Sequence, residues 1–433
     1  MNFNDIFTQY DEGLEKVLEI DPMGFSAIWT HFGQEIFNNK ISSVALDVRS
    51  FNINLFNHFV IRNLIEDSSS LLQNQFKKDL KTAIEKLLII LENMIIWSWY
   101  KDSYVSDDIS KDWGDTKNGL LGTSKAISKW QNKDINLDIT DDITNLEILK
   151  RQKILGVNGR YKGSFINMGF FTSNYDFDEY FDDELFDNTK ELIENNNDLY
   201  ALFNFIIKFF KNENLVVEDI QTELFTNVFK NNQSVTNDTK SFWLNKLGFK
   251  SNDAKNIYDT IDITISYNWD EIKNIFTIAK SIENSSKIDM ILSLEPKLSY
   301  LDGILHYLTF FDSVEIDKLS KKEHFFKLKN LDFDEELSLI SKDCAAKKRL
   351  QELNQVDSIE KLIEYHKNIM EERGHYPWIN IDDNTIKASV KKIKNKEGLS
   401  DKLKDEFSQI QWIHDYYLSS VLNIKKGFKN GTL

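Results

Sequence analysis

Proline and glycine are scarce in this chain, and their scarcity restricts the folds that it can adopt. Only three prolines and 16 glycines occur among 433 residues. Proteins with many strands need these residue types at their turns, so the composition favours helices. The chain is also longer than the ~250–300 residues at which a single hydrophobic core stops growing. The sequence therefore predicts a mainly α, multi-helical protein with two to three packed domains.

Hydrophobic periodicity supports this expectation in two segments. Between residues 76 and 95, apolar side chains recur at intervals of three and four, which predicts one long core helix. Residues 359–370 repeat the pattern, with Asp357 placed to cap the start of the helix and Gly374 placed to end it. His366 falls on the apolar face of this helix, so we expect a buried imidazole whose hydrogen bonds are satisfied.

Glycine placement indicates where the domains meet. Seven of the 16 glycines fall between Gly114 and Gly169, and the stretch from Lys101 to Asp142 is polar with few apolar anchors. We expect a loop-rich boundary there. The predicted organisation is a helical N-terminal domain over residues 1–105, a glycine-rich, basic-then-acidic middle region over residues 106–195, and a helical C-terminal domain over residues 196–433.

A local reversal of charge marks the middle region. The chain as a whole carries a net charge of −16, which repels nucleic acid, yet residues 148–175 contain five basic residues and no acidic one. The layout, with a basic helix, a glycine-bounded turn and an apolar segment at 165–171, resembles a small winged-helix-like element. Any contact with DNA or RNA phosphates is expected to use the five basic residues: Lys150, Arg151, Lys153, Arg160 and Lys162.

An acidic segment follows the basic one directly. Residues Asp176 to Asp187 carry seven carboxylates interleaved with aromatic side chains. Because the two segments have opposite charges, we expect the acidic one to fold over the basic one within the monomer. In the alternative, it imitates a phosphate backbone and is displaced when a partner binds.

The sequence offers one weak metal-site pattern. Asp289, Glu295 and Lys297 follow the carboxylate, carboxylate, lysine order by which Mg²⁺-dependent nucleases hold metal and water on a hairpin. The competing interpretation is a helix that ends at Leu294, with a turn at Glu295-Pro296. The seven histidines show no zinc-ligand spacing, so we expect no metal site and no cofactor.

The loop after the 359–370 helix is a candidate interaction site. Within six residues it combines the cation of Arg373, the imidazole of His375 and the aromatic rings of Tyr376 and Trp378. Such a composition suits gripping a protein partner or stacking on a base. The alternative is a helix cap whose aromatic side chains return to the core.

Compartment and membrane contact are inferred from simple counts. The single cysteine, Cys344, allows no disulfide within the chain, and residues 1–13 lack the basic and apolar regions of a secretory signal. The most apolar stretch, residues 87–99, is short of the ~20 residues that span a bilayer. We expect a cytoplasmic protein without a membrane partner.

Two short stretches resemble a known group of proteins. Asp21 to Phe37 and Leu155 to Phe171 are similar to accessory proteins encoded in bacterial anti-phage defence and restriction operons. The resemblance implies a helper subunit beside an ATPase or nuclease and supplies no catalytic residues. The sequence thus predicts a non-enzymatic accessory or scaffold subunit with protein partners. DNA or RNA binding through residues 150–162 is the alternative, and Mg²⁺-dependent nuclease activity is the third hypothesis.

Overall fold

The structure confirms the prediction of a mainly α-helical chain, and its described residues also form one small antiparallel sheet. The computed structural model describes residues 21–42, 48–67, 72–105, 136–149, 151–177, 183–211, 219–229, 237–282, 286–309, 311–321, 323–389 and 412–430. Across these ranges, no helix combines the length and the apolar character needed to cross a membrane.

The chain divides into two compact units, each assembled from stretches that are separate in sequence. Unit 1 comprises Met1–Gly33, Tyr267–Thr277 and Asn284–Tyr416, and unit 2 comprises Gln34–Ser266, Ile278–Glu283 and Tyr417–Leu433. The domain boundaries that the sequence predicts after residues 105 and 195 stay predictions.

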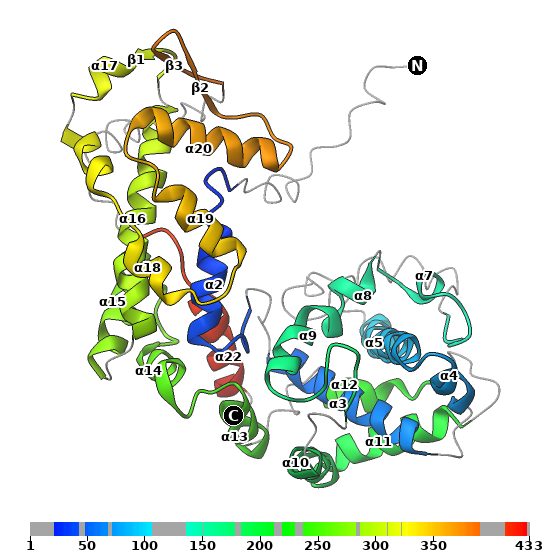
Figure 1. Cartoon of the computed structure of the whole chain (residues 1–433). Coiled ribbons are helices and arrows are strands. Elements are labelled where there is room, and N and C mark those ends of the chain that lie inside the picture. The colour runs from blue at the N-terminus through cyan, green and yellow to red at the C-terminus, as the bar shows by residue number, and fades with distance from the viewer. Residues whose placement is uncertain are drawn as a thin grey trace, which may run out of the picture. The chain divides into compact units, whose positions relative to one another are not determined.

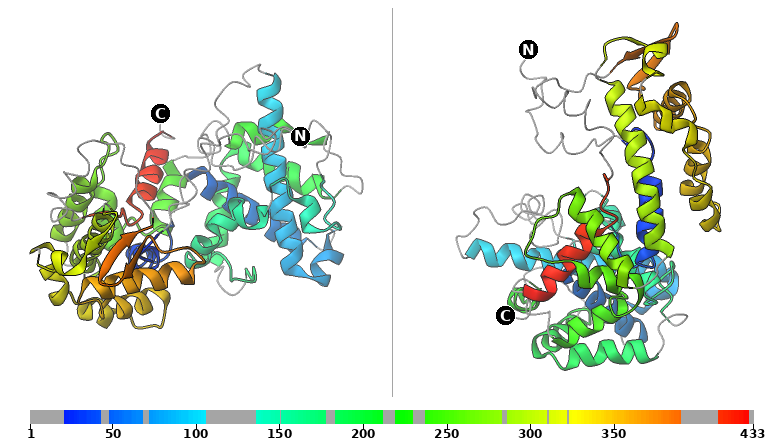
Figure 2. Two further views of the ribbon diagram at one scale, coloured as in Figure 1. Left: turned by 90° about the horizontal axis from the view of Figure 1, so that it is seen from above. Right: turned by 90° about the vertical axis from the view of Figure 1, so that its left-hand side faces the viewer.

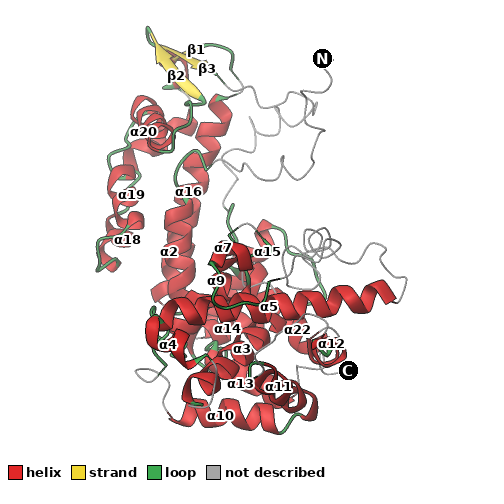
Figure 3. Ribbon diagram, turned by 90° about the vertical axis from the view of Figure 1, so that its right-hand side faces the viewer, coloured by secondary structure: helices red, strands yellow, loops and turns green. Residues whose placement is uncertain are grey.

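Unit 1 is built around one long helix, α16. Beside it lie the start of α2 and the helix α20, with the three strands gathered next to α20 (Figures 1 and 3). The elements found wholly or partly in this unit are α2 (Ser26–Ile36), α15 (Trp269–Ile282), α16 (Ser286–Leu308), β1 (Val314–Glu315), α17 (Ile316–Leu319), the 3-10 helix η3 (Glu323–Asn330), α18 (Asp334–Leu339), α19 (Ala345–Leu353), α20 (Ile359–Glu372), β2 (Ile379–Asp382) and β3 (Thr385–Ala388).

Helix α16 shows that both interpretations of the segment from Asp289 to Lys297, the metal-binding hairpin and the helix that ends at Leu294, are wrong. It runs unbroken through Pro296, so there is neither a hairpin nor a helix end at Leu294. A proline inside a helix costs about 3 kcal/mol. The turns on both sides of it are buried, with Leu294 and Leu298 fully inaccessible, and this packing holds the helix together across the proline.

Helix α20 agrees with the sequence pattern almost residue by residue. Its apolar face, from Ile359 to Met370, is buried as expected. The cap is one residue later than predicted, because the Ser358 hydroxyl, and not Asp357, accepts the backbone N–H of Lys361. Gly374 ends the helix in the left-handed region, with φ of +72°.

The sheet has the order β1-β3-β2, with both pairs antiparallel. Ile386 of β3 is fully buried and lies between Val314 of β1 and Ile381 of β2. The apolar row across one face explains why such short strands pair at all. The hairpin β2–β3 packs against α20 through β2.

Unit 2 is a bundle of helices packed around α3 and α5, and its helices are visible in Figures 1 and 2. Helix α5 packs along α12, while α3 contacts α9, α10 and α22. The helices assigned wholly to this unit are α3 (Val48–Glu66), α4 (Gln73–Lys78), α5 (Leu80–Val105), α7 (Ile143–Leu146), α8 (Gln152–Leu155), α9 (Val157–Asn167), α10 (Asp183–Glu194), α11 (Asn197–Phe209), α12 (Thr222–Phe229), α13 (Asn237–Lys246), α14 (Asn252–Thr260) and α22 (Leu418–Asn430).

The long helix predicted between residues 76 and 95 is present, but it is divided. Phe76 belongs to α4, and Asp79 starts α5 by accepting the backbone N–H of Thr82 at 3.1 Å. Helix α5 then continues to Val105, so the loop predicted from Lys101 begins too early. Most of that predicted loop, residues 106–135, lies outside the described residues.

The basic segment of the middle region forms two short helices, α8 and α9, with a sharp turn at Gly156 between them. The described residues after them, 168–177, form turns and contain no strand that would serve as a wing. The apolar segment expected there is core instead, since Phe165, Phe170 and Phe171 are fully buried. The described residues therefore show two helices joined by a turn, but not the strands of a wing.

Candidate functional site

The first candidate site is the basic segment, and its exposed end lies on α8. Lys150 lies outside the described residues. Arg151 is exposed, and its backbone N–H donates to Glu147. Lys153 places its Nζ 2.6 Å from a carboxylate oxygen of Glu85, a side chain on α5 that is only 6% exposed. Ion pairing with a buried partner reduces the charge that Lys153 offers to a ligand.

The other two basic side chains lie deeper in unit 2. The ammonium of Lys162 sits 3.8 Å from the ring centroid of Tyr175. Burial lowers the pKa of Lys162, and the charge of Glu85 opposes this shift. Arg160 acts electrostatically on the buried carboxylate of Glu92. The basic segment is thus part of the packing of unit 2, and its geometry gives phosphate binding less support than the sequence pattern did.

Glu92 joins α5 to the turn between α8 and α9. Its two oxygens accept the backbone N–H of Val157 at 2.9 Å and the side-chain amide of Gln152 at 3.2 Å. Burial raises the pKa of this carboxyl, while those hydrogen bonds oppose the shift. The carboxylate lies so close to Gly156 that a Cβ built there would be 2.3 Å from it. Glycine is therefore required at this turn for space rather than for an unusual φ.

A second set of buried hydrogen bonds, which joins His58, Asn158 and Tyr175, lies next to those of Glu92. The Nε2 of His58 is 2.9 Å from the Asn158 carboxamide oxygen, and the amide nitrogen of Asn158 donates to the Tyr175 hydroxyl at 2.8 Å. Burial lowers the pKa of His58 to about 3. The imidazole is therefore neutral at physiological pH, with its proton on Nε2. Because aromatic rings enclose it, including Phe171 at 4.2 Å between centroids, the arrangement is structural.

The acidic segment is only partly described. Asp176 is exposed, whereas Phe177 is buried against His58 and Phe171. Residues 178–182 lie outside the described ranges. That the acidic segment folds over the basic one stays a prediction.

The second candidate site is the loop Arg373–Trp378 in unit 1. Its start is fixed by the end of α20, where the backbone N–H of His375 donates to Met370 and that of Gly374 donates to Glu371. Arg373 donates to the carbonyl of Asp21 at 2.7 Å and pairs with its carboxylate at 3.1 Å. This ion pair holds the loop to the segment before α2.

The far end of the loop is held by a buried histidine. The backbone N–H of Trp378 donates to Nε2 of His366 at 2.9 Å, so the proton of that imidazole lies on Nδ1 and is donated to the Pro22 carbonyl. His366 is fully buried, and burial lowers its pKa. The prediction of a satisfied core imidazole is confirmed.

Between these anchors the loop extends into solvent. Tyr376 is 93% exposed, more than any other large apolar or aromatic side chain among the described residues. His375 is exposed too, while Trp378 is half-buried. The helix-cap alternative is thus correct for the backbone, but of the two aromatic side chains Trp378 alone turns toward the protein.

The residues of the third hypothesis do not converge. Asp289, Glu295 and Lys297 all belong to α16, and Lys297 pairs with the buried Glu336 at 2.7 Å. Within the described residues, no group of three or more histidine, cysteine, aspartate or glutamate side chains has the geometry to hold a metal ion.

Glu295 instead fastens three segments of unit 1 together. One oxygen accepts the backbone N–H groups of Ile413 and His414 at 2.7 and 2.9 Å, and the other accepts Trp29 Nε1 at 2.9 Å and the Tyr416 hydroxyl at 2.7 Å. The imidazole of His414 stacks on Trp29, with 4.6 Å between ring centroids. Sequence reasoning missed this role, because the donors are more than a hundred residues away along the chain.

Comparison of the chain with known protein families, with curated proteins and with solved structures found no match. The resemblance to accessory proteins of defence and restriction operons therefore stays a prediction.

Proposed function

We propose that this chain is a non-enzymatic accessory or scaffold subunit of a multiprotein complex, and that a protein partner docks on the loop Arg373–Trp378. The observation that carries the proposal is Tyr376, whose side chain is 93% exposed. Exposed tyrosines that become buried on association are frequent hot spots of protein interfaces.

The contacts that hold the loop on both sides of Tyr376 support this proposal. The loop is fixed on one side by the cap of α20 and by the Arg373–Asp21 contacts, and on the other by the hydrogen bond from Trp378 to His366. A loop that is ordered before binding loses little conformational entropy when it binds, so more of the contact energy appears as affinity. In this arrangement Arg373 and Trp378 position the loop, while Tyr376 and His375 face the partner.

The next strand extends the proposed surface. Ile381 of β2 is 39% exposed, and β2 begins directly after the loop. A tyrosine and an aliphatic side chain that are both exposed and close in sequence give the mixed aromatic and apolar character found at interface centres.

The test is an affinity capture of the tagged protein expressed with its native operon, followed by mass spectrometry of the eluate. The wild-type protein is expected to retain a stoichiometric protein partner, and Tyr376→Ala is expected to lose it. Tyr200→Ala is the matched control, because Tyr200 is an exposed tyrosine, at 44%, on α11 of unit 2. Equal recovery of the partner by both variants would reject the loop as the docking site, and recovery of nucleic acid alone would favour the basic segment instead.

A further inference from the structure

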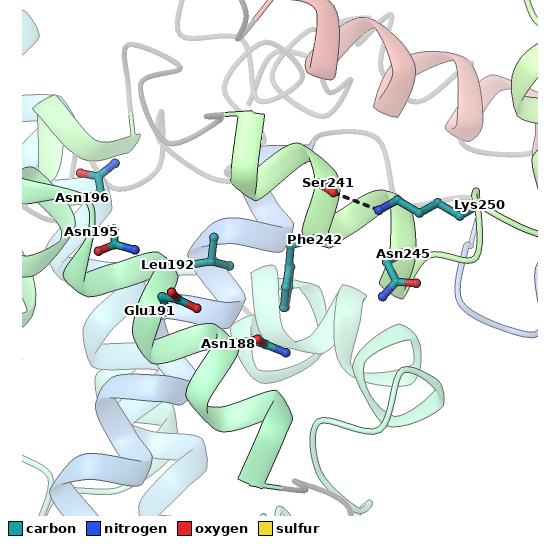
Figure 4. A pocket seen from close by; sticks show the side chains of 9 residues that line it. All are labelled: Asn188, Glu191, Leu192, Asn195, Asn196, Ser241, Phe242, Asn245 and Lys250. Carbon is teal, nitrogen blue, oxygen red and sulfur yellow. Dashed lines mark hydrogen bonds between the residues drawn. The ribbon is translucent and has the colours of Figure 1, made fainter.

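A groove on unit 2 shares no lining residue with the sites considered above. It runs between α10 and α13, has a volume of about 520 Å³, and is drawn in Figure 4. This volume lies within the ~300–1,000 Å³ that small-molecule sites usually occupy. Leu192 and Phe242 supply its apolar surface, and the polar lining consists of Asn188, Glu191, Asn195, Asn196, Ser241, Asn245 and Lys250.

The lining is unusual in its carboxamides. Four of the nine lining residues are asparagines. Asn196 is occupied as the cap of α11, where its side chain accepts two backbone N–H groups at 3.1 Å. The side chains of Asn188, Asn195 and Asn245 make no hydrogen bond to any residue that the structure describes, so their donors and acceptors remain available to a ligand.

The charges of the groove balance. Its two ionisable side chains are Glu191 and Lys250, and the Lys250 ammonium donates to the Ser241 hydroxyl at 2.9 Å. A site for an anion or a cation would have an excess of one sign. One carboxylate and one ammonium, with carboxamides around them, suit a neutral molecule that both donates and accepts many hydrogen bonds.

We propose that this groove binds a neutral saccharide. Carboxamide and carboxylate groups can each bond a pair of neighbouring sugar hydroxyls, because every hydroxyl both donates and accepts. In Figure 4, Leu192 and Phe242 point toward the space between the two helices, where they offer an apolar surface to the C–H face of a sugar ring. The groove belongs to unit 2 and the docking loop to unit 1, so neither proposal depends on the other.

The experiment is saturation-transfer NMR and calorimetric titration of the full chain with glucose, N-acetylglucosamine and maltotriose, with adenosine and uridine as non-sugar probes. At least one saccharide is expected to receive saturation and to bind more tightly than either nucleoside. Asn188→Ala and Asn245→Ala should each weaken that binding about two- to tenfold, the change expected for one lost hydrogen bond.

Asn204→Ala serves as the control. It removes an exposed carboxamide from α11 that does not line the groove and should leave saccharide binding unchanged. Circular dichroism of each variant establishes that the fold is intact. The proposal is overturned if no saccharide binds at millimolar concentration, if a nucleoside binds more tightly than every saccharide, or if the two groove variants bind like the Asn204→Ala control.

Discussion

The carboxyl of Glu295 should make the stability of unit 1 depend on pH in an unusual direction. Burial raises the pKa of this carboxyl to about 7, from an ordinary value of 4.5, although four hydrogen-bond donors favour its ionised form. None of those donors is a cation. Between these two values the folded chain therefore holds a proton that the unfolded chain has released.

The sign and size of the effect follow from proton linkage. Because the folded state binds more protons, the contribution of Glu295 to stability is complete below pH 4.5 and is lost as the pH rises through 7. The shift corresponds to about 2–3 kcal/mol between pH 5 and pH 8. Three histidines act in the opposite sense, since burial lowers the pKa of His58 to about 3, that of His414 to about 4, and that of His366 as well.

Because these histidines change stability with pH in the opposite sense, the effect of Glu295 has to be measured as a difference between the wild type and a variant that lacks its carboxyl. The free energy of unfolding in urea would be measured at pH 5 and pH 8 for the wild type and for Glu295→Gln. The wild type should lose about 2–3 kcal/mol more than the variant between these pH values, because glutamine does not titrate there. Glu364→Gln, which removes an exposed carboxyl from α20, should follow the wild type. Equal pH dependence in the wild type and in Glu295→Gln would refute the reasoning.

Two further predictions concern glycines. Gly156→Ala should destabilise the chain by about 2 kcal/mol or more, because the new Cβ would lie 2.3 Å from the Glu92 carboxylate; Gly163→Ala in α9, where the Cβ meets nothing within 4 Å, should instead stabilise it by about 0.5–1 kcal/mol. Thermal unfolding of both variants tests this pair of predictions. Equal changes in melting temperature would contradict the close contact between a Cβ at position 156 and the Glu92 carboxylate. Gly374→Ala should cost about 1–2 kcal/mol through its φ of +72° alone, and it should weaken partner capture less than Tyr376→Ala. Partner capture that is unaffected by Tyr376→Ala but abolished by Gly374→Ala would show that loop shape, and not the tyrosine, makes the contact.

Elements whose signals are local could be predicted from the sequence. The apolar period of α20, its end at Gly374 and the buried His366 all depend on residues within a few turns of one another. The division between α4 and α5 escaped prediction because apolar spacing continues across it, and the capping side chain of Asp79 breaks the helix without disturbing that spacing.

The parts that could not be predicted depend on contacts between distant residues. Glu295 looks like a turn residue before a proline, and its burial against Trp29 and Tyr416 is decided by packing that no local pattern encodes. The basic segment looks like a phosphate-binding surface in sequence, yet its partner Glu85 lies some seventy residues earlier on α5. The saccharide groove joins α10 to α13 and has no motif at all.

The docking loop was one of the candidates that the sequence offered, and its exposed tyrosine carries the central proposal. The most direct measurement is photo-crosslinking in cells that express the native operon, with benzoylphenylalanine placed at position 376. The proposal predicts one dominant covalent adduct with a single protein, absent when the same group is placed at position 200. Adducts that are absent at position 376, or equal in identity and yield at both positions, would contradict it.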